Sequence, residues 1–139
     1  MAAQGHRTVP HTADLRIEAW AESRDECVAE ALRGLVASFA DISDAQPTRV
    51  LERPMTAGSD TDLLASAADE VIYILDAEGE IPVSVQVHPA GRGIVVVLAL
   101  ARADVVEIIG AVPKAVSFHG LRCEPYATDR WSASMTIDV

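Results

Sequence analysis

Two aspartates near opposite ends of the sequence are the residues whose chemistry stands out. Asp14 opens a segment with strand periodicity, and Asp138 closes another. If those strands are antiparallel neighbours, the start of one lies opposite the end of the other, so both carboxylates meet at one edge of a sheet. The carboxylate of Val139, the last residue, follows one position later. Three anionic groups repel each other unless something offsets them, and a hard cation such as Ca²⁺ or Mg²⁺ suits oxygen ligands.

Simpler interpretations of these residues stay open. Each aspartate can be a solvated side chain at a strand end, and spacing alone favours that interpretation because terminal residues are usually exposed. Lys114, the only lysine of the chain, is expected near the Asp138 end of a hairpin. There its ammonium group could balance the carboxylates or reach a phosphate on a partner's ligand. It could equally be an ordinary exposed lysine.

Familiar catalytic patterns are absent from the sequence. It contains no GxxxxGK[ST] loop, no GxGxxG after a strand and no GxSxG motif. The four histidines do not follow HExxH spacing, so a zinc site would need them to converge from distant elements. His11 could add a ligand to Asp14 or cap the loop. We expect His119, which follows Phe118, to be structural or at the surface, since no nucleophile accompanies it.

Composition narrows the class of protein. The chain has 139 residues, half of them hydrophobic, which predicts a single domain spanning residues 1–139. Its net charge of -10 argues against direct binding of nucleic acid and favours a cation or a basic protein partner. Cys27 and Cys123 lie far apart, and two buried free thiols are favoured over one long-range disulfide.

The segment before Asp14 is polar and does not resemble a signal peptide. No stretch of about 18 apolar residues indicates a membrane span. We therefore expect a cytoplasmic protein without a membrane partner. The oligomeric state cannot be predicted from these patterns.

The elements that must position the two aspartates follow from periodicity. Alternating apolar and polar residues predict a strand over 15–20, with Asp14 on its polar side. Ser23 and Glu26 form a capping box that begins a helix. A second helix is capped by Asp60 or Thr61 and stops at Gly79. The apolar positions of the first helix are Cys27, Ala31, Leu32, Leu35, Val36 and Phe39.

Strands account for most of the remaining chain. The pattern predicts a strand over 48–57 weakened by Pro54, one around 83–87, a turn over 89–93 and a buried or central strand over 94–100. Residues 101–112 are ambiguous. Residues 114–124 and 131–138 predict a hairpin closed by a loop over 125–130. Few helices and late antiparallel strands favour an α+β fold with a mostly antiparallel sheet and two main helices.

Several motifs together resemble one family, the archeases. His11-Thr12-Ala13-Asp14-Leu15 is similar to the opening motif of that family, and residues 112–119 are similar to its lysine-bearing segment. Residues 72–79 look like the end of its second helix. Trp131 and the closing Ile137-Asp138-Val139 are also similar. The resemblance runs from about residue 9 to residue 139, and the order and spacing of the motifs make it specific.

The resemblance implies a function that composition does not indicate. Archeases are accessory factors of the RtcB-type RNA ligase of tRNA splicing and RNA repair, and they promote its guanylylation and multiple turnover. It also implies a bound divalent metal, with calcium as the expected ion and magnesium or manganese as alternatives. The ligands map onto Asp14, Asp138 and Val139, and Lys114 matches a lysine implicated in activation.

One departure and two rival functions accompany this resemblance. The family often has Trp-Leu-Asn-Glu in its second helix, where this chain has Ala67-Ala68-Asp69-Glu70, so the partner-facing surface can differ. The expected protein is a non-catalytic activator. The alternatives are a small metal-dependent phosphohydrolase that uses the same carboxylates and a chaperone-like module that covers a partner's apolar surface.

Overall fold

The strands of the computed structural model form three antiparallel sheets. The structure describes residues 3–10 and 14–139. The four-stranded sheet has the order β1-β2-β9-β8, the three-stranded sheet has the order β4-β6-β5, and β3 pairs with β7. The strands are β1 (Gly5–Pro10), β2 (Asp14–Ala21), β3 (Ala40–Asp41), β4 (Arg49–Met55), β5 (Glu80–Ala90), β6 (Gly93–Arg102), β7 (Glu107–Ile108), β8 (Ala115–Ala127) and β9 (Arg130–Asp138). The predicted α+β class with a mostly antiparallel sheet is confirmed.

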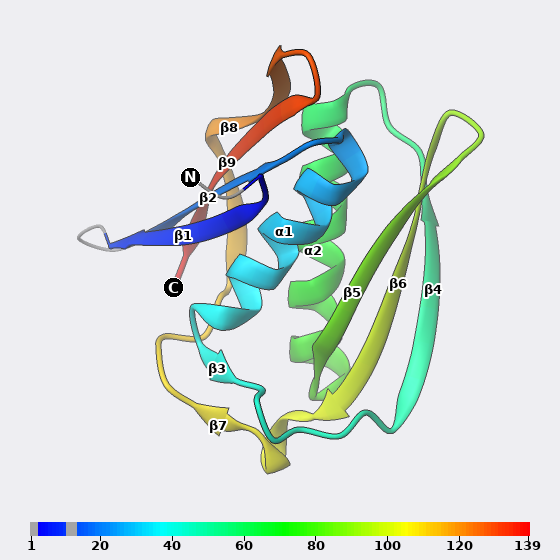
Figure 1. The fold of residues 1–139 in the computed structure, drawn as a ribbon. Helices are drawn as coiled ribbons and strands as arrows, with labels where there is room; N and C mark the ends of the chain where they lie inside the picture. Colours follow the sequence, from blue (N-terminus) through cyan, green and yellow to red (C-terminus); the bar gives the residue numbers. More distant parts are fainter. Residues whose placement is uncertain (1–2, 11–13) are drawn as a thin grey trace.

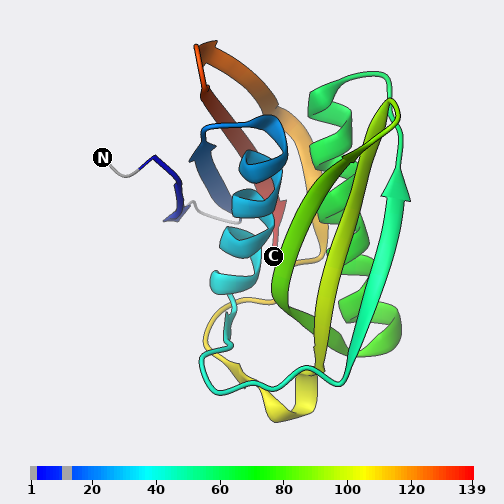
Figure 2. The same ribbon diagram turned by 45° about the vertical axis from the view of Figure 1, so that its right-hand side comes forward.

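Two long helices, α1 (Arg24–Ala37) and α2 (Asp60–Glu78), lie between the two larger sheets. Helix α1 packs against β2 on one side and β5 on the other, and α2 packs against β8 and β5. The two sheets and the helical layer are seen in Figures 1 and 2. Each sheet therefore buries one face against the helices and leaves the other face outward. The polar face of the four-stranded sheet is one of these outward faces.

Helix α1 begins as its sequence predicts. The Ser23 hydroxyl accepts a hydrogen bond from the Glu26 amide at 3.2 Å, which satisfies one of the free amides of the first turn. The six apolar positions predicted for this helix are all buried, although the helix itself ends at Ala37. Phe39, just beyond that end, is fully buried. This packing fixes α1 against the inner face of β2.

The start of α2 differs from the prediction by one residue. Its N-cap is Ser59, whose hydroxyl accepts a hydrogen bond from the Asp62 amide at 3.1 Å, whereas we expected Asp60 or Thr61. Serine and aspartate are about equally favourable at an N-cap, so the sequence does not distinguish Ser59 from Asp60 at this position. Asp60 instead forms an ion pair with Arg24 at 3.2 Å. The C-terminal stop is as predicted, with Gly79 in the left-handed conformation at φ 65°.

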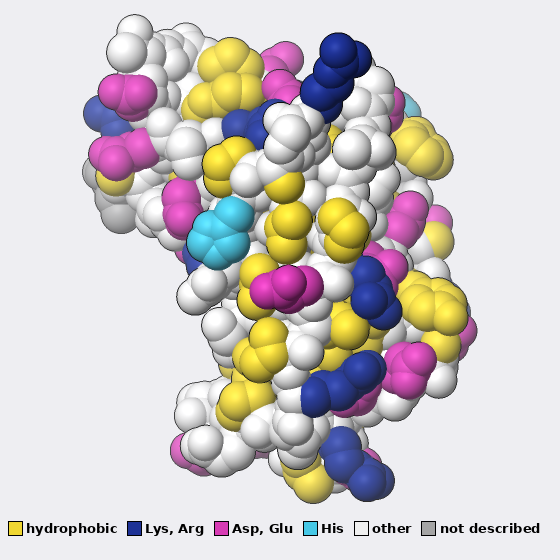
Figure 3. Space-filling view, turned by 90° about the vertical axis from the view of Figure 1, so that its right-hand side faces the viewer, with side chains coloured by type: hydrophobic (Ala, Val, Ile, Leu, Met, Phe, Trp, Pro, Cys, Tyr) yellow, Lys and Arg dark blue, Asp and Glu magenta, His cyan; other side chains and the backbone are white. Residues whose placement is uncertain are grey.

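The three-stranded sheet explains the two strand patterns near its centre. Strand β6 is central, and its inward side chains Ile94, Val96, Leu98 and Leu100 are almost fully buried. Strand β4 is an edge strand, which accommodates Pro54 because an edge residue needs no ladder donor. Figure 3 shows the outward face of this sheet, where apolar side chains are interspersed with charged ones. Strands β5 and β6 run to Ala90 and from Gly93, so the predicted turn over 89–93 is shorter than expected.

The hairpin of β8 and β9 also differs from its prediction in detail. The strands extend to Ala127 and from Arg130, so the expected loop over 125–130 is a tight turn in which Asp129 has φ 53°. Strand β1 was not predicted, because its residues lack apolar alternation and it is stabilised by pairing with β2. Cys27 and Cys123 are buried free thiols, as predicted. Among the described residues, no helix has both the length and the apolar character of a membrane span.

Candidate functional site

Asp14 and Asp138 are direct cross-strand neighbours. The ladder between β2 and β9 pairs Asp14 with Asp138, and it continues with Leu15 opposite Ile137 and Arg16 opposite Thr136. Opposed residues in an antiparallel pair project their side chains on the same face of the sheet, with Cβ atoms about 4.5–5.5 Å apart. Asp14 is half-buried and Asp138 is exposed. The structure therefore brings together the two aspartates that the sequence singled out.

Val139 and Lys114 lie at the same edge. The Lys114 amide donates a hydrogen bond to the main-chain carbonyl of Asp138 at 2.8 Å, which places Lys114 immediately before β8 and beside the end of β9. The Lys114 side chain is exposed and forms no ion pair with any residue in the described ranges. The side chain of Val139 is half-buried and packs against the core. The predicted position of Lys114 next to Asp138 is thus what the backbone shows.

The donor set at this edge suits a hard cation only in part. Two cross-strand carboxylates supply oxygen ligands of the kind that Ca²⁺ and Mg²⁺ take in proteins. Within residues 3–10 and 14–139, no group of three or more histidine, cysteine, aspartate or glutamate side chains is placed to hold a metal. His11, the further ligand considered from sequence, lies outside the described residues. Among the described residues, a third protein ligand at this edge would come from the main chain.

The outward face of the four-stranded sheet carries an arginine-rich cluster beside this edge. Glu18 on β2 is its central carboxylate, and it accepts hydrogen bonds from Arg7 of β1 at 2.8 and 3.2 Å. Arg16 lies 3.2 Å from the other carboxylate oxygen of Glu18. The hydrogen bond from Arg7 is the main cause that holds the pKa of Glu18 below its usual range. Glu18 is therefore an anion at neutral pH and offsets these two cations only in part.

Arg122 of β8 completes the cluster from the opposite side. Its guanidinium donates a hydrogen bond to the Ser132 hydroxyl at 2.6 Å and forms no ion pair with any described residue. The ladder places Ser134 between Glu18 on β2 and Arg122 on β8. Ser134 is almost completely buried, with 7% exposure, so it forms the floor of the face rather than a projection.

Two irregularities in β8 bring further side chains onto this face. The register against β9 shifts between Ser117 and Arg122, and again between Pro125 and Ala127. The first shift contains Gly120 at φ 71°, a conformation that favours glycine, and places His119 over Arg16 and Thr136. The second contains Tyr126, which is 60% exposed and lies beside Trp20 and Arg122. Bulges commonly redirect side chains next to functional sites.

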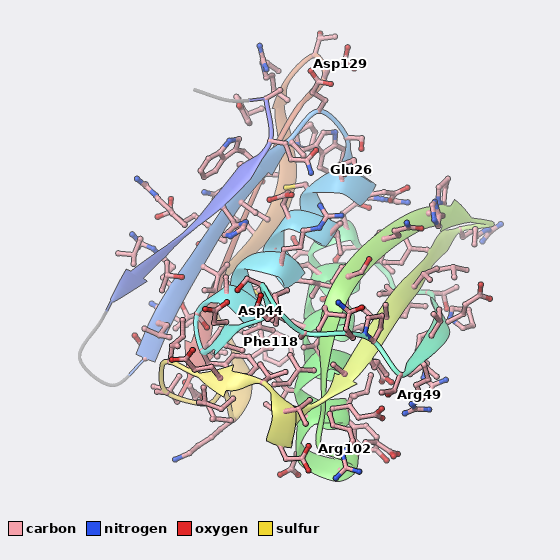
Figure 4. All side chains as sticks on the ribbon, turned by 60° about the horizontal axis from the view of Figure 1, so that its bottom comes forward. Glu26, Asp44, Arg49, Arg102, Phe118 and Asp129 are labelled. Carbon is pink, nitrogen blue, oxygen red and sulfur yellow. The ribbon has the colours of Figure 1, made fainter. Side chains whose placement is uncertain are left out.

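Sequence reasoning did not find this part of the face. His119 was expected to be structural or at the surface, and it is exposed, but the bulge also makes it line the same hollow as Asp14. Gly120 inside a strand pattern was the available signal, since an isolated glycine there often marks a bulge. Phe118, in the same bulge, points away from the core and is 75% exposed (Figure 4).

Three adjoining hollows form one continuous depression along this face, which we call the outer trough. The first is lined by Trp20, Tyr126 and Arg122, the second by Arg122, Arg16 and His119, and the third by Arg16, His119 and Asp14. The middle hollow has a volume of about 410 Å³, and its walls are mostly polar. The outer trough therefore runs from an aromatic end, through a cationic middle, to the aspartate edge.

A larger hollow of about 630 Å³ lies on the other side of β1, between α1 and β5. Its walls are mainly apolar, and a hydrogen-bonded group borders it. Glu30, which is 8% exposed, accepts hydrogen bonds from Gln4 at 2.7 Å and Arg33 at 2.7 Å, and lies 3.0 Å from a ring nitrogen of His6. The arginine also donates to the carbonyl of Val85. This arrangement satisfies a buried carboxylate and contains no nucleophile with a base.

Comparison with known proteins gives a consistent result. The model of the archease protein family matches residues 6–139. Two strains of Mycobacterium tuberculosis have a relative named "Probable protein archease" that is 44% identical over 137 residues, covering 99% of this chain and 76% of the relative. The solution structure of protein 1598 of Methanobacterium thermoautotrophicum has a TM-score of 0.72 and 19% identity, and the match covers 97% of this chain and 99% of that one. The structural match at this identity supports the fold.

Proposed function

The chain belongs to the archease family, and on that premise we propose that it is a non-catalytic accessory activator of an RtcB-type RNA ligase in tRNA splicing and RNA repair. It promotes guanylylation of the ligase and multiple turnover, and it acts in the cytoplasm. The observation that carries this proposal is the cross-strand pair of Asp14 and Asp138 at one exposed sheet edge. These are the residues that the family resemblance assigns to the site.

The chemistry of that edge supports presentation of a charge to a partner. The two carboxylates lie opposite each other there, the main chain of Lys114 is bonded to that of Asp138, and the side chains of Asp138 and Lys114 are exposed. A divalent cation, calcium first and magnesium or manganese otherwise, would be held by Asp14, Asp138 and the Val139 main-chain carboxylate. Such an ion supplies positive charge that offsets the two aspartates and polarises a bound phosphate. The side chains of Asp14 and Asp138 would hold it from two adjacent strands.

The chain's own residues favour an accessory role over hydrolysis. At the aspartate edge, the described residues include no cysteine or serine nucleophile held by a base. Cys27 and Cys123 are buried away from this face and cannot reach a ligand there. A metal-dependent phosphohydrolase remains the rival function, and it predicts turnover of nucleotides by the isolated protein.

A reconstitution experiment tests the proposal. The RNA ligase of the same organism is purified, and formation of ligase-GMP and joined RNA is followed with and without this protein. The proposal predicts that the protein alone converts no nucleotide, and that a substoichiometric amount of it increases the number of turnovers per ligase. Equal ligase turnover in its presence and absence would contradict the activator role. Nucleotide hydrolysis by the protein alone would favour the phosphohydrolase.

A further inference from the structure

The outer trough has the chemistry of a nucleotide site, with its three parts in a consistent order. At one end Tyr126 and Trp20 offer aromatic surfaces, and in the middle Arg122 and Arg16 offer guanidinium groups. At the other end lies Asp14, opposite Asp138. Aromatic side chains stack on bases, guanidinium groups bind phosphates in a planar fork, and carboxylates hold the divalent cation that accompanies a polyphosphate.

The cationic middle of the trough has spare charge for an anion. Arg122 donates a hydrogen bond to the Ser132 hydroxyl and pairs with no carboxylate among the described residues. Glu18 is shared between Arg7 and Arg16, so these two cations face one anion. In the middle hollow, two arginines and one glutamate leave one net positive charge, on a protein whose total charge is -10 and beside the two aspartates at the end of the trough. Such an excess attracts a compact anion at close range, where salt screens it least.

The bulges of β8 indicate that this face is built for binding. A regular β8 would alternate its side chains between the two faces of the sheet. The two register shifts break that alternation, and the displaced residues include His119 and Tyr126, which both line the trough. The hydroxyls of Ser134 and Thr136 lie along the trough between them and add donors without charge. A face that served only to meet solvent would need neither irregularity.

From this arrangement we infer that the outer trough binds a mononucleotide polyphosphate, with its phosphates at Arg16, Arg122 and His119 and its base against Tyr126 and Trp20. The metal-bearing edge at Asp14 and Asp138 then lies next to the phosphates. Mg²⁺ is commonly bound by one or two carboxylates together with substrate phosphates. If phosphate oxygens complete the coordination of the ion, two side-chain carboxylates are enough, and the edge has no third metal-binding side chain among the described residues.

The size and charge of the ligand decide between a nucleotide and an RNA strand. A long polyanion extends beyond the trough and is repelled by the negative electrostatic potential of a chain whose net charge is -10. A mononucleotide places all its charge within the cationic middle of the trough. The choice of a guanosine nucleotide as the ligand rests on the proposed function, in which the partner ligase is guanylylated.

Binding to the isolated protein tests the inference without the ligase. Calorimetry at constant ionic strength with Mg²⁺ measures the affinity for GTP, for inorganic pyrophosphate and for a single-stranded RNA pentamer. Chemical shifts of the wild-type protein locate each contact. We expect saturable binding of GTP, tighter than that of pyrophosphate because the base adds stacking. The largest shifts should fall on His119, Arg122 and Tyr126.

Matched variants separate the phosphate and base contributions. Arg122→Gln should weaken GTP binding by about tenfold or more, the size of a charge-assisted contact. Arg102→Gln is its control, because Arg102 is exposed, pairs with Asp104 and lies at the end of β6 away from the trough (Figure 4). Tyr126→Ala should weaken GTP binding by about tenfold and leave pyrophosphate unchanged. Tyr73→Ala is the control for Tyr126→Ala, because Tyr73 lies on α2 and is 59% exposed. It should change neither the affinity for GTP nor the affinity for pyrophosphate.

Each remaining outcome contradicts the inference. Absence of saturable GTP binding would contradict the phosphate site. Equal GTP affinities of wild type and Arg122→Gln would contradict it as well. Equal affinities for GTP and pyrophosphate, or tighter binding of the RNA pentamer, reject a mononucleotide as the ligand. The test is separate from the proposed function. Stimulation of the ligase without GTP binding overturns only this inference, and GTP binding without stimulation overturns only the activator role.

Discussion

Asp14 and Asp138 face each other across the antiparallel ladder of β2 and β9, on the outward side of the sheet. Like charges in directly opposed positions destabilise a strand pair. A divalent cation, proposed above for this edge, would offset that repulsion. The main-chain hydrogen bond from Lys114 to Asp138 holds the end of β9 in place, so the edge is fixed on both sides by neighbouring strands.

The first prediction concerns a divalent cation at this edge. A ligand that binds only the folded state stabilises it by about 2.7 kcal/mol at a hundredfold excess over its Kd. Calcium should therefore raise the Tm of the wild-type protein by several degrees, and a chelator should reverse the change. Asp138→Asn should abolish this increase, as measured by thermal unfolding with and without Ca²⁺.

Asp129→Asn is the control for that experiment. Asp129 lies in the turn at the opposite end of the same hairpin (Figure 4), and its positive φ of 53° is one that asparagine also adopts. This variant should keep the full calcium response. An equal response of Asp138→Asn and wild type would exclude Asp138 as a ligand.

The second prediction concerns the buried carboxylate of Glu30. Burial favours its neutral form, but hydrogen bonds from Gln4, His6 and Arg33 together outweigh burial and hold the pKa of Glu30 below its usual range. A group whose pKa is lower in the folded state stabilises the fold above its unfolded pKa, and this stabilisation is lost as the pH falls through the folded pKa. Stability should therefore decrease as the pH falls from near 4.5, the ordinary value, toward lower pH.

Glu30→Gln tests this sign. The variant should be less stable than wild type at pH 7 by about 1–3 kcal/mol, because Arg33 and His6 lose a charged acceptor. The difference should narrow at low pH, as measured by denaturant unfolding across a pH series. Glu52→Gln is the control, since Glu52 is exposed and has no ion pair within the described residues. A constant difference between wild type and Glu30→Gln at every pH would contradict the assignment.

The third prediction concerns the two thiols. Cys27 of α1 and Cys123 of β8 are both almost fully buried, and the Cys27 thiol donates a hydrogen bond to the main-chain carbonyl of Ala19 at 3.8 Å. The interaction between the two thiols, together with burial, raises the pKa of Cys123, and the same interaction lowers the pKa of Cys27. Because both sulfurs are shielded from solvent by burial, neither cysteine should react with a thiol reagent in the native protein. Both should react on unfolding in denaturant. Rapid labelling of the native protein would show that the α1 and β8 contact opens readily.

The fourth prediction concerns the bulge that carries His119. Gly120 has φ 71°, so Gly120→Ala forces an L side chain into the left-handed region. The cost is about 1–2 kcal/mol, measured as a lower denaturant midpoint. Gly58→Ala is the matched control, because Gly58 precedes α2 without a positive φ and an added Cβ would meet only the Asp62 side chain, at 4.0 Å. Equal midpoints for Gly120→Ala and Gly58→Ala would mean that the bulge relaxes without strain.

Sequence reasoning reached the elements whose periodicity is local. Alternation in residues 15–20, the cap at Ser23 and the stop at Gly79 each depend on neighbours within one element, and the structure has them. The juxtaposition of Asp14 with Asp138 also followed from one assumption, that the first predicted strand and the last are antiparallel neighbours. The structure meets that assumption with β2 and β9 adjacent in the sheet.

Features that depend on distant partners were not predicted. Strand β1 exists because β2 offers it an edge, and its residues alone give no strand signal. The bulges of β8 are defined only against β9, so the positions of His119 and Tyr126 on the outer face could not be obtained from β8 alone. Asp60, one of the expected caps of α2, instead pairs with Arg24 at the start of α1, a distant partner that the local sequence does not indicate.

The central claim is that the Asp14 and Asp138 pair acts on a ligase. Its most direct measurement is multiple-turnover RNA ligation by the purified ligase with wild-type protein, Asp14→Asn, Asp138→Asn or the Asp129→Asn control. We expect wild type and Asp129→Asn to stimulate turnover equally. Each of the other two variants should lose about tenfold or more of that stimulation, the usual effect of removing one charge from a close contact. Full stimulation by both Asp14→Asn and Asp138→Asn would contradict it.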